Sequence, residues 1–186
     1  NFEHFRKCTE KFTKHGLRTA AFVTSQNENT FGPWPVTDGL PTLELHRNLP
    51  IEVQAKHLIS LETINDIRIS NFYLNKEELE KWGSKRKDMV IIDVTIHENT
   101  PEVERKIILE ELHYNRGDIS DNMIRSTQPR VKYKGHKFPI FNAPEIIRRG
   151  DVIIESSEYG HYAGELQIAL NDMVNSGKTN VVGRIK

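Results

Sequence analysis

The 186-residue sequence has little cysteine, no surplus of charge and no long hydrophobic run. Its single cysteine, Cys8, cannot form a disulfide within the chain, which excludes a disulfide-stabilised scaffold. The 26 basic side chains balance 26 acidic ones, so no overall electrostatic field calls for nucleic acid or a membrane surface as partner. No apolar run approaches the roughly 18 residues of a membrane-spanning helix, and no signal-peptide pattern is present. These absences predict a soluble, cytoplasmic, globular protein.

Common catalytic and metal-binding signatures are also missing from the sequence. The eight histidines are scattered without an HExxH pattern, and one cysteine cannot build a thiolate metal site. GxSxG, P-loop and GxGxxG patterns are absent as well. We therefore expect no metal and no cofactor.

The chain opens with a helical pattern. Phe2, Phe5, Cys8 and Phe12 recur at the spacing of one helix face, and Gly16 stands where a helix C-cap glycine belongs. No Met precedes this pattern. We expect that the chain is a piece of a longer protein.

Helix and strand patterns then alternate up to about residue 84. "LRTAAFVTS" predicts a strand buried on both faces, residues 25–41 predict a long loop, and Pro50 suits the first turn of a helix. "NDIRISNFY" predicts a second strand, and Asn75 with Glu78 fits a capping box that opens a third helix. The alternation favours an α/β arrangement with parallel strands. Two strands do not make a stable parallel sheet alone, so further sequence is expected to complete it.

The pattern changes after the polar stretch "GSKRKD" at residues 83–88, which we interpret as a linker. From there the period is two, with Ile92, Val94 and Ile96 on one face of a strand. Many short strands separated by turn residues are typical of a small β-barrel or sandwich. The further strand candidates are "ERKIILEELHY", "NMIRST", "RVKYKG", "GDVIIES", "GELQIALN" and "TNVVGRI".

Three stretches could carry chemistry, and the first is "GLPTLELHRNLP" at residues 39–50. If it followed a strand of a (β/α) barrel, it would lie at the end that bears active sites. Glu44 could then act as acid or base, His46 as a proton shuttle and Arg47 as an anion clamp. The same spacing also fits an ordinary helix start, with Thr42 as its cap and the charged side chains in water.

The second stretch, "IRSTQPRVKYKG", concentrates cations and hydroxyls on a predicted strand–turn–strand. Arg125, Ser126, Thr127 and Arg130 are the residue types that bind phosphate, because arginine offers a fork of donors and hydroxyls add hydrogen bonds. A solvated basic hairpin, balanced by nearby acids, would show the same pattern.

The third stretch is "ESSEYGHYAGELQI", in which Tyr159, Tyr162 and Glu165 could hold a sugar by stacking and hydrogen bonding. A loop whose tyrosines cover the mouth of a barrel is the alternative.

Long runs of the sequence resemble a known family. "GLPTLELHRNLPIEVQAKHL" with "NDIRISNFYLNKEEL", and "IRSTQPRVKYKG" with "GDVIIESSEYGHYAGELQIAL", are similar to the bacterial 6-phospho-N-acetylmuramidase family. The resemblance implies an α+β chain of two domains. Residues 1–84 would be the last βα units of a TIM-like barrel, and residues 89–186 a cyclophilin-like β-barrel. At residue 161 the resemblance leads us to expect an arginine-like side chain, where this sequence has His161.

The resemblance also implies a cytoplasmic glycoside hydrolase that cleaves N-acetylmuramic acid 6-phosphate–N-acetylglucosamine during cell-wall sugar recycling. Glu44 and His46 are then the candidate catalytic residues. The partner would be this phosphorylated amino-sugar disaccharide, with no nucleic acid and no membrane. The candidate substrate-binding residues are Arg47, Arg125, Ser126, Thr127, Arg130, Tyr159, Tyr162 and Glu165.

Because a glycosidase uses two carboxyl groups, and earlier barrel strands would supply at least one, we expect this chain alone to be inactive. The incomplete barrel would expose apolar surface, and we expect this surface either to be covered by a second copy of the chain, as in a homodimer, or to be poorly ordered. Two other functions stay open. One is a non-catalytic module that binds a sugar phosphate, and the other is a cyclophilin-like peptidyl-prolyl isomerase.

Overall fold

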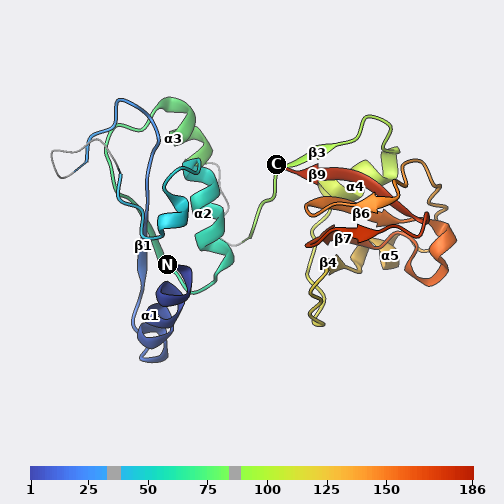
Figure 1. Ribbon diagram of the computed structural model, residues 1–186, viewed down its shortest axis with the longest axis horizontal. Helices are drawn as coiled ribbons and strands as arrows, with labels where there is room; N and C mark the ends of the chain where they lie inside the picture. The colour runs from blue at the N-terminus through green and yellow to red at the C-terminus, as the bar shows by residue number, and fades with distance from the viewer. Residues whose placement is uncertain (33–38, 84–88) are drawn as a thin grey trace. The chain divides into compact units, whose positions relative to one another are not determined.

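The computed structural model describes residues 1–32, 39–83 and 89–186. The chain is of mixed α+β type and divides into two compact units, Asn1–Ile91 and Ile92–Lys186 (Figure 1). Residues 33–38 of the predicted loop and residues 84–88 of the predicted linker lie outside the described residues. Among the described residues, no helix combines the length and the apolar character needed to cross a membrane.

The first unit has the element order expected from its sequence. It runs through α1 (Phe2–Lys14), β1 (Ala20–Val23), a 3-10 helix (Glu44–His46), α2 (Ile51–Ser60), β2 (Asp66–Ile69) and α3 (Lys76–Gly83). The two strands pair in parallel, with Ala20 opposite Asp66 and Val23 opposite Ile69. The predicted parallel arrangement is thus confirmed.

Local side-chain chemistry sets the helix ends of this unit. Gly16 follows α1 with a φ of 70°, a left-handed conformation that favours glycine at a helix end. At α3 the predicted capping box is present. The N–H of Glu78 donates to Asn75 Oδ1 at 2.8 Å, and the N–H of Asn75 donates to Glu78 Oε2 at 3.2 Å.

The core of the first unit lies on one face of the two-stranded sheet. Ala21 and Val23 of β1 are buried with Leu43, Ile51 and Leu58. The alternate residues of β1 are exposed, and Phe22 keeps 48% of its surface accessible. The expectation that this strand is buried on both faces is therefore wrong for the described residues, because their core packs against one face only.

The second unit is built on a five-stranded antiparallel sheet in the order β3-β9-β6-β7-β4 (Figure 1). The strands are β3 (Val94–Ile96), β4 (Met123–Ser126), β6 (Asp151–Glu155), β7 (Leu166–Ala169) and β9 (Thr179–Ile185). Two short strands, β5 (Ile146–Ile147) and β8 (Met173–Val174), pair separately. Two helices, α4 (Glu102–Glu110) and α5 (Gln128–Lys132), and a 3-10 helix (Ser157–Tyr162) complete the unit.

Two predicted strands of the second unit are helices. Most of "ERKIILEELHY" lies in α4, which follows Pro101 and buries Glu104 and Ile107 on one face. The first half of "RVKYKG" lies in α5, where Pro129 occupies the first turn, a position that tolerates its missing N–H. The predicted strand–turn–strand is therefore a strand followed by a short helix.

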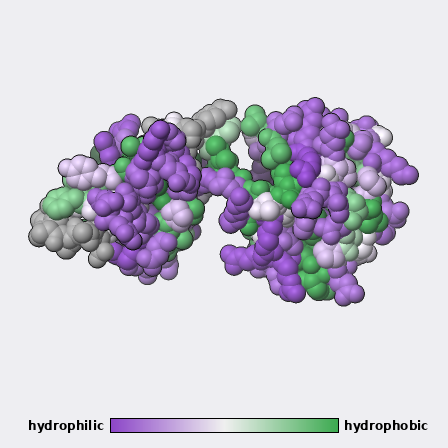
Figure 2. All heavy atoms as spheres, turned by 90° about the horizontal axis from the view of Figure 1, so that it is seen from above, coloured by the Kyte–Doolittle hydropathy of each residue, from purple (hydrophilic) through white to green (hydrophobic). Residues whose placement is uncertain are grey.

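The two faces of the five-stranded sheet differ in chemistry. Ile154, Leu166 and Val182 pack with Ile107 and Phe138 on one face. The other face is apolar at Ile153 and Val181. It has a polar end, because the strand register places Arg125 opposite Gln167 and Glu155 opposite Thr179. Hydrophilic residues cover most of the molecular face seen in Figure 2, with smaller hydrophobic areas between them.

Candidate functional site

Polar residues gather at the carboxyl end of β1 in the first unit. A cavity of about 260 Å³ opens there, at the end of a parallel sheet where ligand sites are common. Ser25 lines this cavity and is held by two hydrogen bonds. Its N–H donates to Asn71 Oδ1 at 2.9 Å, and its hydroxyl donates to Glu78 Oε1 at 2.7 Å. The lining residues are Thr24, Ser25, Gln26, Asn27, Glu28, Thr30, Gly39, Arg47 and Asn48.

Glu44 and Arg47 form a forked ion pair beside this cavity. Arg47 Nε lies 2.5 Å from Glu44 Oε1, and Nη2 lies 2.8 Å from Oε2. Arg47 Nη1 also donates to the carbonyl of Gly39 at 3.2 Å, and Arg47 lines the cavity. The hydrogen bond from Arg47 lowers the pKa of Glu44, so this carboxylate is suited to act as a fixed negative charge rather than as an acid.

The structure places His46 in the interior, apart from the cavity. Its side chain is fully buried, and its Nε2 lies 2.7 Å from Nδ1 of His57. Burial of the ring, and to a smaller extent the charge of His57, lower the pKa of His46 to about 4. His46 is thus a neutral, packed side chain that supports the turn carrying Glu44, and it does not line the cavity.

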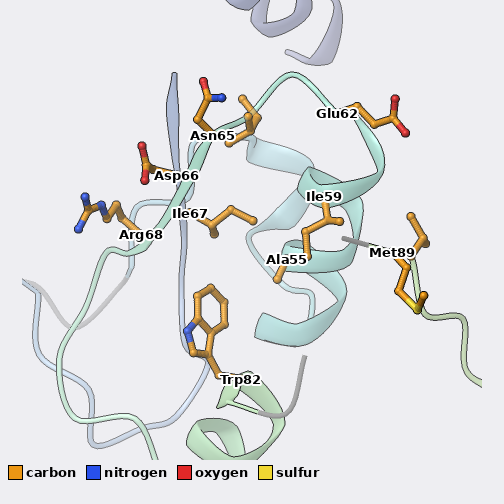
Figure 3. A pocket seen from close by; sticks show the side chains of 11 residues that line it. Ala55, Ile59, Glu62, Asn65, Asp66, Ile67, Arg68, Trp82 and Met89 are labelled. Atoms are coloured by element: carbon orange, nitrogen blue, oxygen red, sulfur yellow. The ribbon is translucent and has the colours of Figure 1, made fainter. Parts of the chain in front are cut away.

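The larger cavity of the first unit, about 540 Å³, lies elsewhere, beside α2 and β2. In Figure 3 Ala55 and Ile59 come from α2, Ile67 from β2, and Trp82 from α3. Its polar lining comes from Glu62, Asn65, Asp66 and Arg68, and none of the predicted site residues borders it.

The second unit places two arginines against a buried carboxylate and links a third arginine to them through Asp118. We call Arg116, Arg125, Arg130, Asp118 and Glu165 the arginine cluster. Arg116 Nη1 lies 3.6 Å from Glu165 Oε1 and Arg130 Nη1 lies 3.3 Å from Oε2, while the Glu165 side chain has no accessible surface. Asp118 joins the other side, with Oδ1 at 2.9 Å from Arg116 Nε and Oδ2 bonded to Arg125.

A hydrogen-bonded layer on neighbouring strands lies next to this cluster. Glu155 accepts from Gln167 Nε2 at 3.0 Å and from Thr179 Oγ1 at 2.6 Å. Burial raises the pKa of Glu155, and the nearby charge of Glu165 raises it further. The two buried carboxyl groups thus have different partners, because Glu155 accepts hydrogen bonds from neutral side chains and Glu165 is approached by arginines.

Two tyrosines lie beside the arginines. The guanidinium of Arg130 lies 5.5 Å from the ring centre of Tyr162, within the range of a cation–π contact. Tyr159 packs edge-on against Tyr162 at 6.1 Å, and the two side chains remain 40% and 39% exposed. Exposed aromatic faces beside arginines are suited to a sugar that carries an anionic group.

The structure separates the predicted hydroxyls from the arginines. Ser126 is buried on the opposite face of β4 from Arg125, where its hydroxyl lies 2.9 Å from Nδ1 of His113 and donates to Gln128 at 2.8 Å. Thr127 is the N-cap of α5 and makes no capping hydrogen bond with its side chain. Arg125, Arg130, Tyr159, Tyr162 and Glu165 are thus brought together, and Ser126 is not.

Sequence reasoning missed Arg116 and Gln167 as site residues, and it treated Asp118 only as a nearby acid that balances the basic stretch. Both Arg116 and Asp118 belong to the stretch "NRGD", whose backbone returns beside β4, with the N–H of Arg116 donating to the carbonyl of Arg125 at 3.0 Å. The alternation of Glu165 with Gln167 was the available signal, since it puts both polar groups on one sheet face. Among residues 1–32, 39–83 and 89–186, no group of three or more metal-ligating side chains occurs.

Family models match both parts of the chain. The model described as "6-phospho-N-acetylmuramidase, N-terminal" matches residues 1–84, and the one described as "6-phospho-N-acetylmuramidase, C-terminal" matches residues 90–186. No curated protein matches the chain.

Two solved structures are similar to the chain. An uncharacterized B. cereus protein shares 47% identity with a TM-score of 0.92, and the match covers 99% of this chain and 52% of that one. A conserved Enterococcus faecalis protein of unknown function shares 24% identity with a TM-score of 0.66, covering 99% and 48% of the two chains, and supports the fold alone. The chain therefore spans about half the length of the solved structures it matches.

Proposed function

Because the chain belongs to the 6-phospho-N-acetylmuramidase family, we propose that it is the C-terminal part of a glycoside hydrolase acting on N-acetylmuramic acid 6-phosphate–N-acetylglucosamine. The reaction would release N-acetylglucosamine during cell-wall sugar recycling. We also propose that the protein is cytoplasmic, because sugar phosphates form where phosphoryl donors are available.

The proposal includes a finer description of the two units. The first is assigned to the last βα units of a TIM-like barrel, supported by its parallel β1–β2 pair with α2 between the two strands in sequence. The second is assigned to a cyclophilin-like β-barrel, supported by its five antiparallel strands.

The observation that carries the proposal is the arginine cluster with its neighbouring tyrosines. Arg116 and Arg130 approach one buried carboxylate, and Tyr162 lies against Arg130 with an exposed ring. Arginine forks recognise phosphate and carboxylate, and an aromatic face accepts a sugar ring. A substrate that combines a sugar with anionic groups fits both features.

For the first unit, we propose that Glu44 contributes a negative charge at the β1 cavity and that Arg47 helps bind the substrate. Their forked pair lies beside the cavity, and the pKa of Glu44 is lowered by Arg47. His46 takes a positioning role, because its buried ring packs behind the turn that carries Glu44.

A module that binds a phosphorylated sugar without cleaving it is the second candidate. The observation that favours it is the pairing of Glu44 with Arg47, because a glycosidase requires two carboxyl groups that flank the scissile bond. A peptidyl-prolyl isomerase has less support, since the arginine cluster offers charge where a proline pocket requires apolar surface.

The test is the release of N-acetylglucosamine from the phosphorylated disaccharide by the full-length protein. We expect turnover, and we expect Arg130→Ala to lower kcat/KM at least tenfold, mainly through KM. Arg148→Ala is the matched control, because Arg148 is an exposed arginine of the same unit that pairs with Asp172 at 2.8 Å, outside the cluster. Binding of the disaccharide by a folded full-length protein without any turnover would favour the second candidate.

A further inference from the structure

The arginine cluster holds more positive than negative charge. Three guanidinium groups meet two carboxylates, those of Asp118 and Glu165, while the nearby carboxyl group of Glu155 is held by Gln167 and Thr179. Burial raises the pKa of Glu155, which reduces the negative charge that this group adds beside the cluster. The side chains of Arg125 and Arg130 are each 22% exposed, and that of Arg116 is 32% exposed. Partly buried charges interact more strongly than fully exposed charges do, so the excess of one positive charge within the cluster favours a bound anion.

Several polar atoms of the cluster have no hydrogen-bond partner in the part of the chain that the structure describes. They are Nε of Arg125 and both carboxylate oxygens of Glu165. Arg130 makes one long hydrogen bond, to the carbonyl of His161 at 3.4 Å, besides its ion pair with Glu165. Because arginine has five donors, this leaves donors for a ligand.

We propose that the arginine cluster is the subsite for a singly charged carboxylate on the sugar, and that Arg116 and Glu165 set this preference over phosphate. This inference rests on the proposed function and deepens it. The phosphorylated muramic acid unit carries two anionic groups, a lactyl carboxylate and a 6-phosphate. A carboxylate brings one negative charge and neutralises the cluster. A phosphate monoester brings nearly two and would repel Asp118 and Glu165.

Glu165 acts in this arrangement as a positioning residue. Its carboxylate lies between Arg116 and Arg130, at 3.6 Å and 3.3 Å, and holds their guanidinium groups on the polar end of the sheet. It also sets the charge of the site. Replacing it with an uncharged side chain of the same shape adds one net positive charge and removes a repulsion toward dianions.

Calorimetric titration of the 186-residue chain tests this assignment with three sugars. N-acetylmuramic acid carries the carboxylate alone, N-acetylglucosamine 6-phosphate carries the phosphate alone, and N-acetylglucosamine carries neither. We expect N-acetylmuramic acid to bind at least tenfold more tightly than N-acetylglucosamine 6-phosphate. The variant Arg116→Ala should bind N-acetylmuramic acid at least tenfold more weakly than the parent chain does. The loss of affinity should be smaller in Arg116→Lys and absent in the control Arg148→Ala.

The variant Glu165→Gln tests the positioning role through selectivity, which a merely structural role would not change. We expect the affinity ratio of phosphate sugar to carboxylate sugar to rise about tenfold, in a protein whose circular dichroism is unchanged. Tighter binding of the phosphate sugar by the parent chain overturns the proposal, and so does failure of a folded parent chain to bind N-acetylmuramic acid. Turnover of the disaccharide by the full-length protein in either case would show that the proposed function survives without this subsite.

Discussion

At the scale of single residues, the second unit buries carboxyl groups, which costs free energy unless other groups compensate for the lost hydration. Glu155 is held by a hydroxyl and an amide, and its pKa is raised by burial. Glu165 has no such hydrogen bonds and faces Arg116 and Arg130 instead. An arrangement stabilised by charge rather than by hydrogen bonds leaves donors for a ligand, and this is why we place the binding function there.

The buried histidine pair of the first unit leads to a pH prediction. The pKa of His46 is lowered to about 4, whereas an unfolded histidine has a pKa of about 6.5. As the pH falls, the unfolded chain takes up this proton first, so stability that is complete above about pH 6.5 is lost between there and about pH 4. The full difference corresponds to about 3 kcal/mol, and we expect roughly half of it after allowing for water access.

Urea unfolding followed by tryptophan fluorescence measures this effect, because Trp82 belongs to α3 of the first unit and residues 92–186 contain no tryptophan. The unfolding midpoint should fall between pH 7.5 and pH 4.5. His46→Gln should remove most of that fall, whereas His15→Gln, at an exposed position, should keep it. An unchanged pH dependence in His46→Gln would contradict the account.

Some residues of the candidate site could be predicted from the sequence, and others could not. Arg125, Arg130 and Glu165 were named because phosphate-binding and sugar-binding residue types cluster in their stretches. Ser126 was named for the same reason, but strand alternation turns it to the opposite sheet face. Arg116 was missed because its contact with the cluster depends on how a loop folds back beside β4, which spacing alone does not determine.

At the scale of elements, the capping box of α3 links a helix end to the polar cavity. Glu78 accepts from both the N–H of Asn75 and the hydroxyl of Ser25. We expect Asn75→Ala to lower the free energy of unfolding of the first unit by about 1 kcal/mol, the usual effect of losing an N-cap side chain. Tryptophan-detected urea unfolding is the measurement. Lys76→Ala, at an exposed neighbouring position with an ion pair at 3.7 Å, is the control and should change stability by less than about 0.5 kcal/mol.

The turn that leads into β7 depends on Gly164. Its φ is 81°, and a Cβ there would meet the ring of Phe138 at 2.5 Å. We expect Gly164→Ala to destabilise the second unit by about 3 kcal/mol, through both backbone strain and overpacking. Gly177→Ala is a matched control, because Gly177 has a φ of 80° but no neighbour within 4 Å, so only the strain of about 1 kcal/mol applies.

Hydrogen exchange of the β7 amides measures both glycine variants. Equal effects on exchange would show that the contact with Phe138 does not matter.

Helices and strands were predicted with unequal success, for a physical reason. The elements of the first unit follow clear signals, such as Pro50 before α2 and the Asn75–Glu78 pair before α3. In α4 and α5, short apolar runs between charged residues fit both the helical period of 3.6 and the strand period of two, and the sequences on either side of them favour strands. Tertiary packing of Ile107 against the sheet decided in favour of the helix.

At the scale of the whole molecule, the first unit presents a two-stranded parallel sheet with exposed apolar side chains. Phe22 and Phe72 are 48% and 59% exposed, and a cavity of about 540 Å³ adjoins β2. We propose that the isolated 186-residue chain covers this surface by forming a homodimer. Light scattering after size-exclusion chromatography should show a dimer at about 100 µM, a concentration at which associations with Kd in the micromolar range are populated.

The variant Phe22→Ser should shift that chain toward monomer, whereas Val174→Ser, at an exposed position of the second unit, should not. A parent chain that stays monomeric at this concentration would contradict the dimer proposal.

We propose that the full-length protein acts on a phosphorylated muramic acid disaccharide. The most direct measurement compares kcat/KM of the full-length protein for N-acetylmuramic acid 6-phosphate–N-acetylglucosamine with that for the same disaccharide without phosphate. We expect turnover of the phosphorylated disaccharide and at least a hundredfold lower kcat/KM without the phosphate. Equal turnover of the two, or turnover of neither by a folded full-length protein, would contradict this proposal.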